Sequence, residues 1–300
     1  MRNIAFIGVG RMATPMVWRF VERGWRAHLL DPLPEATAPF RDHPQVTIHD
    51  GVDTLLREAT VVLLSLPTPT ALLQVSGQLS ASAQVRPAST VINTSTTGPA
   101  ATREAADRLA AAGLTFVDAP VSGGPAGAQR GSLTIIVSGE PDAVSGCAPV
   151  FEVIGERVLN VGSQPGQAQA MKVANNVLAL GALAATSEAT ALTSKAGIPL
   201  DVAIDVLNVS SGRNSATAVK FPDSILTGRF DFGFPVEGAL KDVTLFTDLA
   251  AELGVPAPLA RAVVDCWRLA VDQGYGEQDC TRIATMYERM AGLPAERGER

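Results

Sequence analysis

Short runs of apolar residues, many of them β-branched, alternate with longer amphipathic stretches along the first half of the chain. The runs are bounded by glycine, proline and polar residues, as strands are, and the stretches between them have the apolar spacing of helices. The predicted strands are residues 3–7, 27–31, 46–49, 61–66, 90–93, 115–118 and 133–138. Helices are predicted over 12–23, ended by Gly24, and over 100–112, ended by Gly113. This alternation predicts a mostly parallel, doubly wound α/β sheet.

The second half of the chain lacks this alternation. Residues 167–196 form a stretch rich in Ala, Leu, Asn and Thr without proline, and Pro-Gly precedes it. A helix of this length spans about 45 Å, which is enough to join two domains. Further helical patterns cover residues 201–207, 240–253 and 258–273. We therefore predict an α/β domain over residues 1–163 and an all-α domain over residues 164–300, and we expect the charged tail 295–300 to be disordered.

Composition narrows the class of protein. Of the 300 residues 46% are hydrophobic, and Asp and Glu (30) outnumber Lys and Arg (24), so the net charge is −6. A nucleic-acid partner is not expected, because such proteins carry a basic face. The most apolar stretch, 177–185, is about half of a membrane span, and no signal peptide is recognisable, so the expected protein is soluble, cytoplasmic and without a membrane partner. The three cysteines lack CxxC spacing, so neither a disulfide framework nor a metal site is expected.

A glycine fingerprint directly follows the first predicted strand. It consists of Gly8, Val9, Gly10, Arg11, Met12 and Ala13. In a dinucleotide-binding turn the first glycine permits the tight bend, and the second lets the pyrophosphate approach the backbone. The alternative is an ordinary tight turn between a strand and a helix.

Asp31 ends the second predicted strand, about 20 residues past the fingerprint, where an acidic side chain accepts hydrogen bonds from the adenosine ribose. No arginine follows to bind a 2′-phosphate, so the sequence favours NAD over NADP. The alternative is that Asp31 only caps the turn before Pro32.

Two further segments contain groups suited to a small carboxylate substrate. Ser122, Gly123 and Gly124 follow a strand, and together they can present hydroxyl and N–H donors, although the segment could equally be a turn. Lys172 and Asn176 lie four residues apart in an almost uncharged helical stretch, so they share one helix face. Lysines are common on exposed helix faces, but this one lies at the predicted domain junction, where pockets concentrate.

The few histidines and tyrosines of the chain argue against other kinds of catalytic site. The three histidines all precede residue 50 and lack a catalytic pattern, and neither tyrosine has a lysine four residues later. A histidine triad and a Tyr/Lys acid–base pair are therefore not supported. The chain has only four lysines: Lys172, Lys195, Lys220 and Lys241. Lys241 is followed by an aspartate, and by itself this pair indicates only a salt-bridged surface.

Taken together, these motifs resemble the β-hydroxyacid dehydrogenase family, which includes 3-hydroxyisobutyrate dehydrogenase and tartronate semialdehyde reductase and is related to 6-phosphogluconate dehydrogenase. The resemblance covers nearly the whole chain, at residues 8–16, 66–68, 93–96, 118–124, 166–176, 210–213 and 241–242. Ala13 replaces the usual glycine, and Asn93 stands where an acidic residue is common. Neither departure removes a reacting group.

The resemblance implies a Rossmann-like N-terminal domain, a long interdomain helix and a helical C-terminal domain, with the active site in the cleft. It implies that Lys172 is the catalytic residue and that Asn176 and Ser122-Gly123-Gly124 hold the substrate. The remaining implied contacts are those of the cofactor with Leu66, Pro67, Thr96 and Lys241, and of the substrate with Arg213.

The function expected from this resemblance is NAD-dependent interconversion of a small β-hydroxy acid and its semialdehyde or ketone, by a homodimer or homotetramer. The alternatives are a tartronate semialdehyde or sulfolactaldehyde reductase, an imine reductase on the same fold, and a non-catalytic dinucleotide-binding protein. In the imine reductase branch and in non-catalytic members the lysine is replaced, so Lys172 argues against both. The short length argues against a 6-phosphogluconate enzyme.

Overall fold

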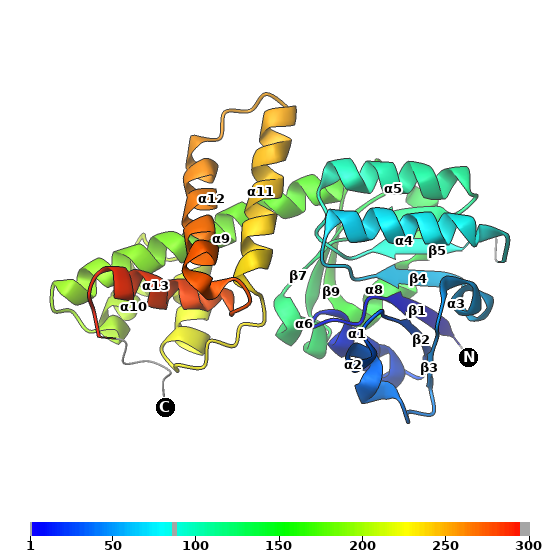
Figure 1. The fold of residues 1–300 in the computed structure, drawn as a ribbon, viewed down its shortest axis with the longest axis horizontal. Helices are drawn as coiled ribbons and strands as arrows, with labels where there is room; N and C mark the ends of the chain where they lie inside the picture. The colour runs from blue at the N-terminus through cyan, green and yellow to red at the C-terminus, as the bar shows by residue number, and fades with distance from the viewer. Residues whose placement is uncertain (1, 86–88, 295–300) are drawn as a thin grey trace. The chain divides into compact units, whose positions relative to one another are not determined.

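The computed structural model describes residues 2–85 and 89–294 and divides the chain into two compact units, Met1–Lys172 and Val173–Arg300 (Figure 1). The boundary falls inside one continuous helix, α9 (Gln167–Lys195). The predicted tail 295–300 lies outside the described residues. The expected class, an α/β unit followed by a helical unit, is confirmed.

The first unit alternates strands and helices. Its strands are β1 (Asn3–Ile7), β2 (Arg26–Leu30), β3 (Val46–Ile48), β4 (Val61–Leu64), β5 (Thr90–Asn93), β6 (Thr115–Asp118), β7 (Val121–Ser122), β8 (Leu133–Ser138) and β9 (Gly155–Gly162). Its helices are α1 (Ala13–Glu22), α2 (Pro34–Thr37), α3 (Val52–Glu58), α4 (Pro69–Ala81), α5 (Pro99–Ala111), α6 (Gly124–Arg130), α7 (Pro141–Gly146) and α8 (Ala148–Ile154), with short 3₁₀ turns at Ala38–Phe40 and Ala83–Val85. All seven predicted strands are present, each within two residues of its predicted ends.

The sheet has the strand order β3-β2-β1-β4-β5-β6-β8-β7, with β9 paired to β8. The first six strands are parallel, and β8 is antiparallel to both β6 and β7. The order reverses at β1 and β4, and ligands of doubly wound sheets bind beyond the carboxyl ends of the strands at such a reversal.

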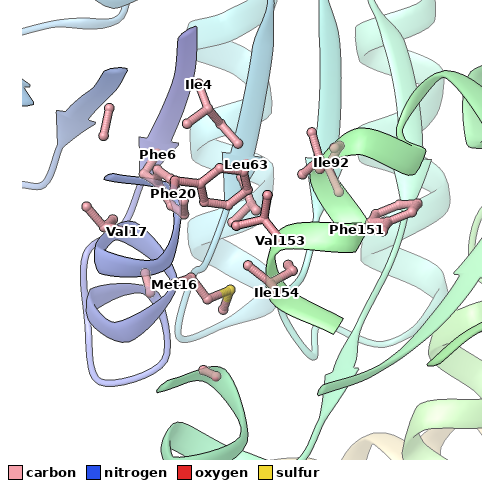
Figure 2. Close-up of a cluster of buried hydrophobic side chains, with 14 of the residues drawn as sticks. Ile4, Phe6, Met16, Val17, Phe20, Leu63, Ile92, Phe151, Val153 and Ile154 are labelled. Atoms are coloured by element: carbon pink, nitrogen blue, oxygen red, sulfur yellow. The ribbon is translucent and has the colours of Figure 1, made fainter. Parts of the chain in front are cut away.

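Alternate residues of a strand point to opposite faces of the sheet, and in β1 the residues on both faces are buried. Ile4 and Phe6 of β1 pack on one side against α1 and α8, as Figure 2 shows. Ala5 and Ile7 pack on the other side against α3, α4 and α5. Glycines end α1 and α5 as predicted: Gly24 and Gly113 have φ values of +76° and +77°, which side chains disfavour.

The second unit is built from helices around a separate apolar core. It contains most of α9, α10 (Leu200–Val209), a wide π-type helix (Ala216–Ile225), α11 (Val236–Glu252), α12 (Pro258–Ala270), which continues as a π turn (Val271–Tyr275), a 3₁₀ turn (Cys280–Arg282) and α13 (Ile283–Met290). Trp267 and Phe221 are fully buried in this core. Helices α11 and α12 run side by side (Figure 1).

Three details differ from the prediction. β7 has only two residues, and β9 is mostly exposed, so neither shows the buried apolar pattern of a strand. α11 begins at Val236, so Lys241 lies in its second turn and not at its start. Helix α9 is long and apolar enough to cross a membrane by length and composition, which the sequence pattern did not indicate. The fully buried Gln169, with polar partners in the sheet, identifies the start of this helix as packed in protein.

Candidate active site

The turn between β1 and α1 lies at the carboxyl ends of the parallel strands. Gly8 has a φ of +87°, and a Cβ atom there would collide with the carbonyl oxygen of Ser65, so only glycine fits. Gly10 is different, because no atom lies within 4 Å of the place where its Cβ would stand. Ala13 is fully buried at the start of α1, where the helix meets the sheet. The turn is therefore tight at Gly8 and open at Gly10.

Asp31 holds this turn. One oxygen of its carboxylate accepts a hydrogen bond from the backbone N–H of Val9 at 2.7 Å, and the other accepts from the N–H of Leu33 at 2.8 Å. The second bond is that of a turn residue, whereas the first joins the end of β2 to the fingerprint. Each oxygen keeps a further lone pair, so the carboxylate can still accept from a ribose hydroxyl.

The residues present fit a dinucleotide. Among the described residues no side chain caps the N-terminus of α1, and its first turn carries no acidic group. A helix N-terminus of this kind favours a pyrophosphate, and the open space at Gly10 allows one to approach the backbone. Arg11 and Met12 follow in the same turn, and Arg11 is exposed. When bound, a nicotinamide dinucleotide supplies the hydride acceptor or donor.

A hydrogen bond joins the loop that follows β4 to the loop that follows β5. The N–H of Leu66, which precedes Pro67, donates to Ser95 Oγ at 2.7 Å. Buried Asn93 accepts from the Ser95 N–H at 3.2 Å and donates to Thr97 Oγ1 at 3.2 Å, so it bridges the loop that contains Thr96. An acidic residue could not make this donation while ionised, which gives Asn93 a structural role of its own.

A buried junction joins the loop after β5, the end of β6 and the start of α9. The side-chain amide of Gln169 uses both of its hydrogens, donating to Asp118 Oδ1 at 2.7 Å and to the Ser95 carbonyl at 3.0 Å. Its oxygen accepts from the N–H groups of Thr97 and Gly98 at 2.9 and 3.2 Å. Every donor and acceptor of the amide is satisfied, so its orientation is unambiguous.

Asp118 completes this junction from the sheet side. Its other carboxylate oxygen accepts from the N–H groups of Gly166 and Gln169 at 3.0 and 3.3 Å and from Ser138 Oγ at 3.4 Å. Burial raises the pKa of this carboxyl to about 6, because the loss of solvation outweighs the hydrogen bonds that stabilise its charge. The carboxylate therefore anchors the first turn of α9, three residues before Lys172.

The predicted substrate loop follows β6 directly. Ser122 is half-buried at the end of β7, opposite Thr134 of β8. Gly123 has a φ of +133°, and a Cβ there would lie 3.1 Å from the Leu133 side chain, so the bend after Ser122 requires glycine. Gly124, with a φ of +64°, begins α6. Two glycines with positive φ therefore connect Ser122 to the start of α6.

Lys172 is 7% exposed, so it is not the ordinary surface lysine that helix statistics favour. Asn176 follows one helical turn later on the same face of α9. Its amide donates to Asp242 Oδ2 at 2.6 Å. The Nζ of Lys241 lies 2.8 Å from the other oxygen of the same carboxylate, and Asp242 is 2% exposed. Asp242 thus holds Asn176 and Lys241 together inside the second unit.

Among the described residues, Arg213 takes no part in the hydrogen bonds of Asn176 and Asp242. It is exposed in the turn after α10, where its N–H donates to the Ser210 carbonyl at 3.2 Å. Its assignment to the substrate stays a prediction. Sequence reasoning missed Gln169, and it did not give Asp118 and Asp242 their structural roles. The available signal was the presence of uncharged or acidic polar residues inside otherwise apolar strand and helix patterns.

Comparison with known proteins identifies the family of this chain. Residues 3–162 match the family model described as the NAD binding domain of 6-phosphogluconate dehydrogenase, and residues 166–287 match that described as NAD-binding of NADP-dependent 3-hydroxyisobutyrate dehydrogenase. The L-threonate dehydrogenase of Escherichia coli is 30% identical over 95% of this chain and 94% of its own length. The chain belongs to the β-hydroxyacid dehydrogenase family.

Other members of the β-hydroxyacid dehydrogenase family agree with this placement. The 2-(hydroxymethyl)glutarate dehydrogenase of Eubacterium barkeri is 29% identical over 99% of this chain and 98% of its own length. The solved structure of Mycobacterium tuberculosis 3-hydroxyisobutyrate dehydrogenase with L-serine has a TM-score of 0.84, 29% identity, and coverage of 95% of this chain and 99% of that one. As a β-hydroxyacid dehydrogenase, the chain is an oxidoreductase with NAD(P)-binding domains that acts on a hydroxy acid.

Proposed function

We propose that this β-hydroxyacid dehydrogenase interconverts a small β-hydroxy acid and its semialdehyde or ketone with NAD as cofactor, and that Lys172 is its acid–base residue. The observation that carries the proposal is Lys172 itself, an almost fully buried lysine at the start of α9. The junction of Asp118 and Gln169 fixes its helix turn, and Asn176 extends the same face.

In the proposed mechanism each polar group has one task. Ser122 and the N–H groups at Gly123 and Gly124 bind the substrate carboxylate. Asn176 orients the reacting hydroxyl, and Lys172 accepts the hydroxyl proton during oxidation or returns it during reduction. A positioned acid–base group of this kind contributes about 10²–10⁴ in rate. Asp242 keeps Asn176 and Lys241 in place, and Lys241 lies on the nicotinamide side.

The remaining assignments are further contacts of the cofactor and of the substrate. Leu66, Pro67 and Thr96 contact the cofactor, and Arg213 serves the substrate. A cytoplasmic location is part of the same proposal. A tartronate semialdehyde or sulfolactaldehyde reductase uses the same groups in the reducing direction, and an imine reductase would not require Lys172.

The function is tested by assaying purified protein with NAD against 3-hydroxyisobutyrate, glycerate, serine, threonate and 3-sulfolactate. We expect NADH formation with at least one acid, and loss of that activity when Lys172 is replaced. Reduction of cyclic imines without turnover of any hydroxy acid or semialdehyde would contradict the proposal. So would cofactor binding without turnover of any compound.

We expect NAD to be preferred over NADP by about tenfold or more in kcat/KM, because the Asp31 carboxylate would face the 2′-phosphate with like charge. The measurement is the ratio of kcat/KM for the two cofactors with the best substrate. Asp31→Asn should narrow this ratio. Higher efficiency with NADP in the unmodified protein would overturn the assignment of Asp31 to the ribose.

We also expect the protein to form at least a dimer, as a homodimer or homotetramer. Helix α9 exposes Leu178 and Leu192 by 74% and 71%, and exposed apolar side chains of this size on one element are typical of an interface. Light scattering at micromolar concentration measures the mass directly. A particle with the mass of one chain would refute the expectation, and Leu178→Lys should weaken a dimer that uses this face.

A further inference from the structure

Two histidines that the proposed mechanism leaves unused contact each other near one edge of the sheet. His28 lies in β2, and His49 directly follows the short edge strand β3. His28 Nδ1 lies 3.0 Å from His49 Nε2, which is a hydrogen-bond distance. His28 is 4% exposed, whereas His49 is only half-buried. Among the described residues, the second ring nitrogen of His28, Nε2, is buried without a hydrogen-bond partner.

The hydrogen bond between the two rings limits where protons can be placed. When both rings are neutral, His28 can donate from Nδ1 to His49 Nε2, and His28 Nε2 then carries no proton. A cationic His28 carries a proton on Nε2 as well as on Nδ1. A cationic His49 donates from Nε2, so His28 must accept through Nδ1 and carry its own proton on Nε2. Every protonated form that keeps the hydrogen bond therefore buries an N–H donor without an acceptor, which is unfavourable.

The charges around the pair do not offset this cost. Burial is the largest influence on the pKa of both rings and lowers it, and His49 and Arg26 lower the pKa of His28 further. Glu58, at the end of α3, raises the pKa of both rings, and Asp50 raises that of His49, but each of them acts less strongly than burial. The residues paired with His28 in β1 and β3 carry no charge. Both rings are therefore neutral at neutral pH, and they take up a proton only at a lower pH than an exposed histidine does.

The pair joins β3 to the strand that leads to Asp31. β3 pairs with β2 over only three residues. Beyond them, the His49 N–H donates to the carbonyl of Leu29, two residues before Asp31, at 2.8 Å. The contact with the His28 ring is thus a second link between the same two segments. Asp31 in turn accepts from the Val9 N–H of the glycine fingerprint. Loss of the histidine contact would loosen the short edge strand beside the residue that holds the fingerprint.

We infer that the His28–His49 pair is a pH-sensitive latch: when neutral it holds the end of β3 to β2 beside Asp31, and when protonated it releases this end and weakens dinucleotide binding. The effect on the dinucleotide rests on the proposed function, because it requires Asp31 to bind the ribose. Release gives both rings access to water, so that every N–H donor finds an acceptor. The closed latch binds protons more weakly than the open one, so a dinucleotide that binds the closed form lowers the pKa of both rings further.

The affinity for NAD at two pH values tests the latch. By calorimetry, the Kd of NAD should rise by about twofold to tenfold between about pH 7.5 and about pH 5 in the wild type, which corresponds to one hydrogen bond. In the double variant His28→Asn/His49→Gln, amide groups replace the two bonded ring nitrogens, so the hydrogen bond can form without a titrating group. This variant should bind NAD as the wild type does at about pH 7.5 and lose most of the rise at about pH 5. His43→Asn, which removes the histidine outside the pair, should keep the wild-type rise. A wild-type Kd that does not change overturns the inference, and so does a double variant that keeps the full rise.

A measurement without cofactor separates the latch from the proposed function. The chain has three histidines, so NMR of protein with isotopically labelled histidine resolves each ring, and single variants assign the signals. We expect the pKa of His28 and of His49 to lie below that of an exposed histidine. The hydrogen-exchange protection of the N–H at position 49, which is bonded to the Leu29 carbonyl, should fall about twofold to tenfold from about pH 7.5 to about pH 5, and it should stay constant in the double variant. If NAD does not bind but this protection falls, the proposed cofactor use is wrong and the latch stands. If both rings titrate as exposed histidines do, or if the protection does not change, the latch is wrong.

Discussion

Replacement of Lys172 with alanine is expected to lower kcat by about two to four orders of magnitude while NAD affinity stays nearly unchanged, because an acid–base group acts in the chemical step. Its burial and its place on the anchored first turns of α9 make a surface role inconsistent with the structure. The measurement is kcat with the best acid of the panel, together with NAD affinity by fluorescence or calorimetry. Lys195→Ala, an exposed lysine on the same helix, should behave as wild type.

Lys172→Arg distinguishes proton transfer from charge alone. The guanidinium keeps a positive charge and donors but does not release a proton in a protein, so kcat should fall almost as far as in Lys172→Ala. If Lys172→Arg retains most of the wild-type kcat, Lys172 is an electrostatic anchor and the proton moves through another group or through water.

Gln169→Leu is expected to lower the free energy of unfolding by about 3–5 kcal/mol. The substitution leaves the N–H groups of Thr97 and Gly98, the Ser95 carbonyl and one Asp118 oxygen buried without their partner. Denaturant unfolding measures the loss. Gln169→Glu keeps the acceptor for the two N–H groups but faces Asp118 with a second carboxyl, so its destabilisation should be greater at about pH 8 than at about pH 5. Equal stability of Gln169→Leu and wild type would contradict the role of the junction.

The pH dependence of the free energy of unfolding tests the raised pKa of Asp118. Its pKa is raised from 3.8 to about 6 in the folded chain, so between these values the native state binds more protons than the unfolded state. The contribution of this group to stability therefore falls by about 3 kcal/mol as pH rises from about 4 to about 6, and it is constant above this range. Asp118→Asn should remove this slope, which is seen as the difference between the wild-type and variant curves. Parallel curves would show that Asp118 titrates normally.

The sequence predicts the strands and helices whose positions depend on local pattern. The buried strands of the first unit carry apolar residues on both faces, and Gly24 and Gly113, which precede or follow predicted elements, have positive φ. The positions of these elements along the chain therefore follow from the apolar pattern and from the residues that favour turns. Lys172 and Asn176 were paired correctly on one face because four residues make about one helical turn. β9 was missed because its mostly exposed residues carry no apolar pattern.

The contacts that hold the candidate site could not be predicted in the same way. Asp118 and Gln169 are 51 residues apart, and Asn176 and Asp242 are 66 apart. A polar residue within an apolar stretch indicates that a partner is needed, but the identity of that partner depends on which strand ends and helix starts the fold brings together.

The hydrogen bond between the Asp31 carboxylate and the Val9 N–H limits how the cofactor preference can change, in evolution or by engineering. A single replacement of Asp31 by serine, made to admit a 2′-phosphate, would leave one hydroxyl oxygen in place of the two carboxylate oxygens that accept from the N–H groups of Val9 and Leu33. Such a variant gains room for the phosphate but loses order in the loop that binds the pyrophosphate. A complete exchange of cofactor therefore requires at least two coordinated substitutions, one that accommodates the phosphate and one that supplies a new acceptor for Val9.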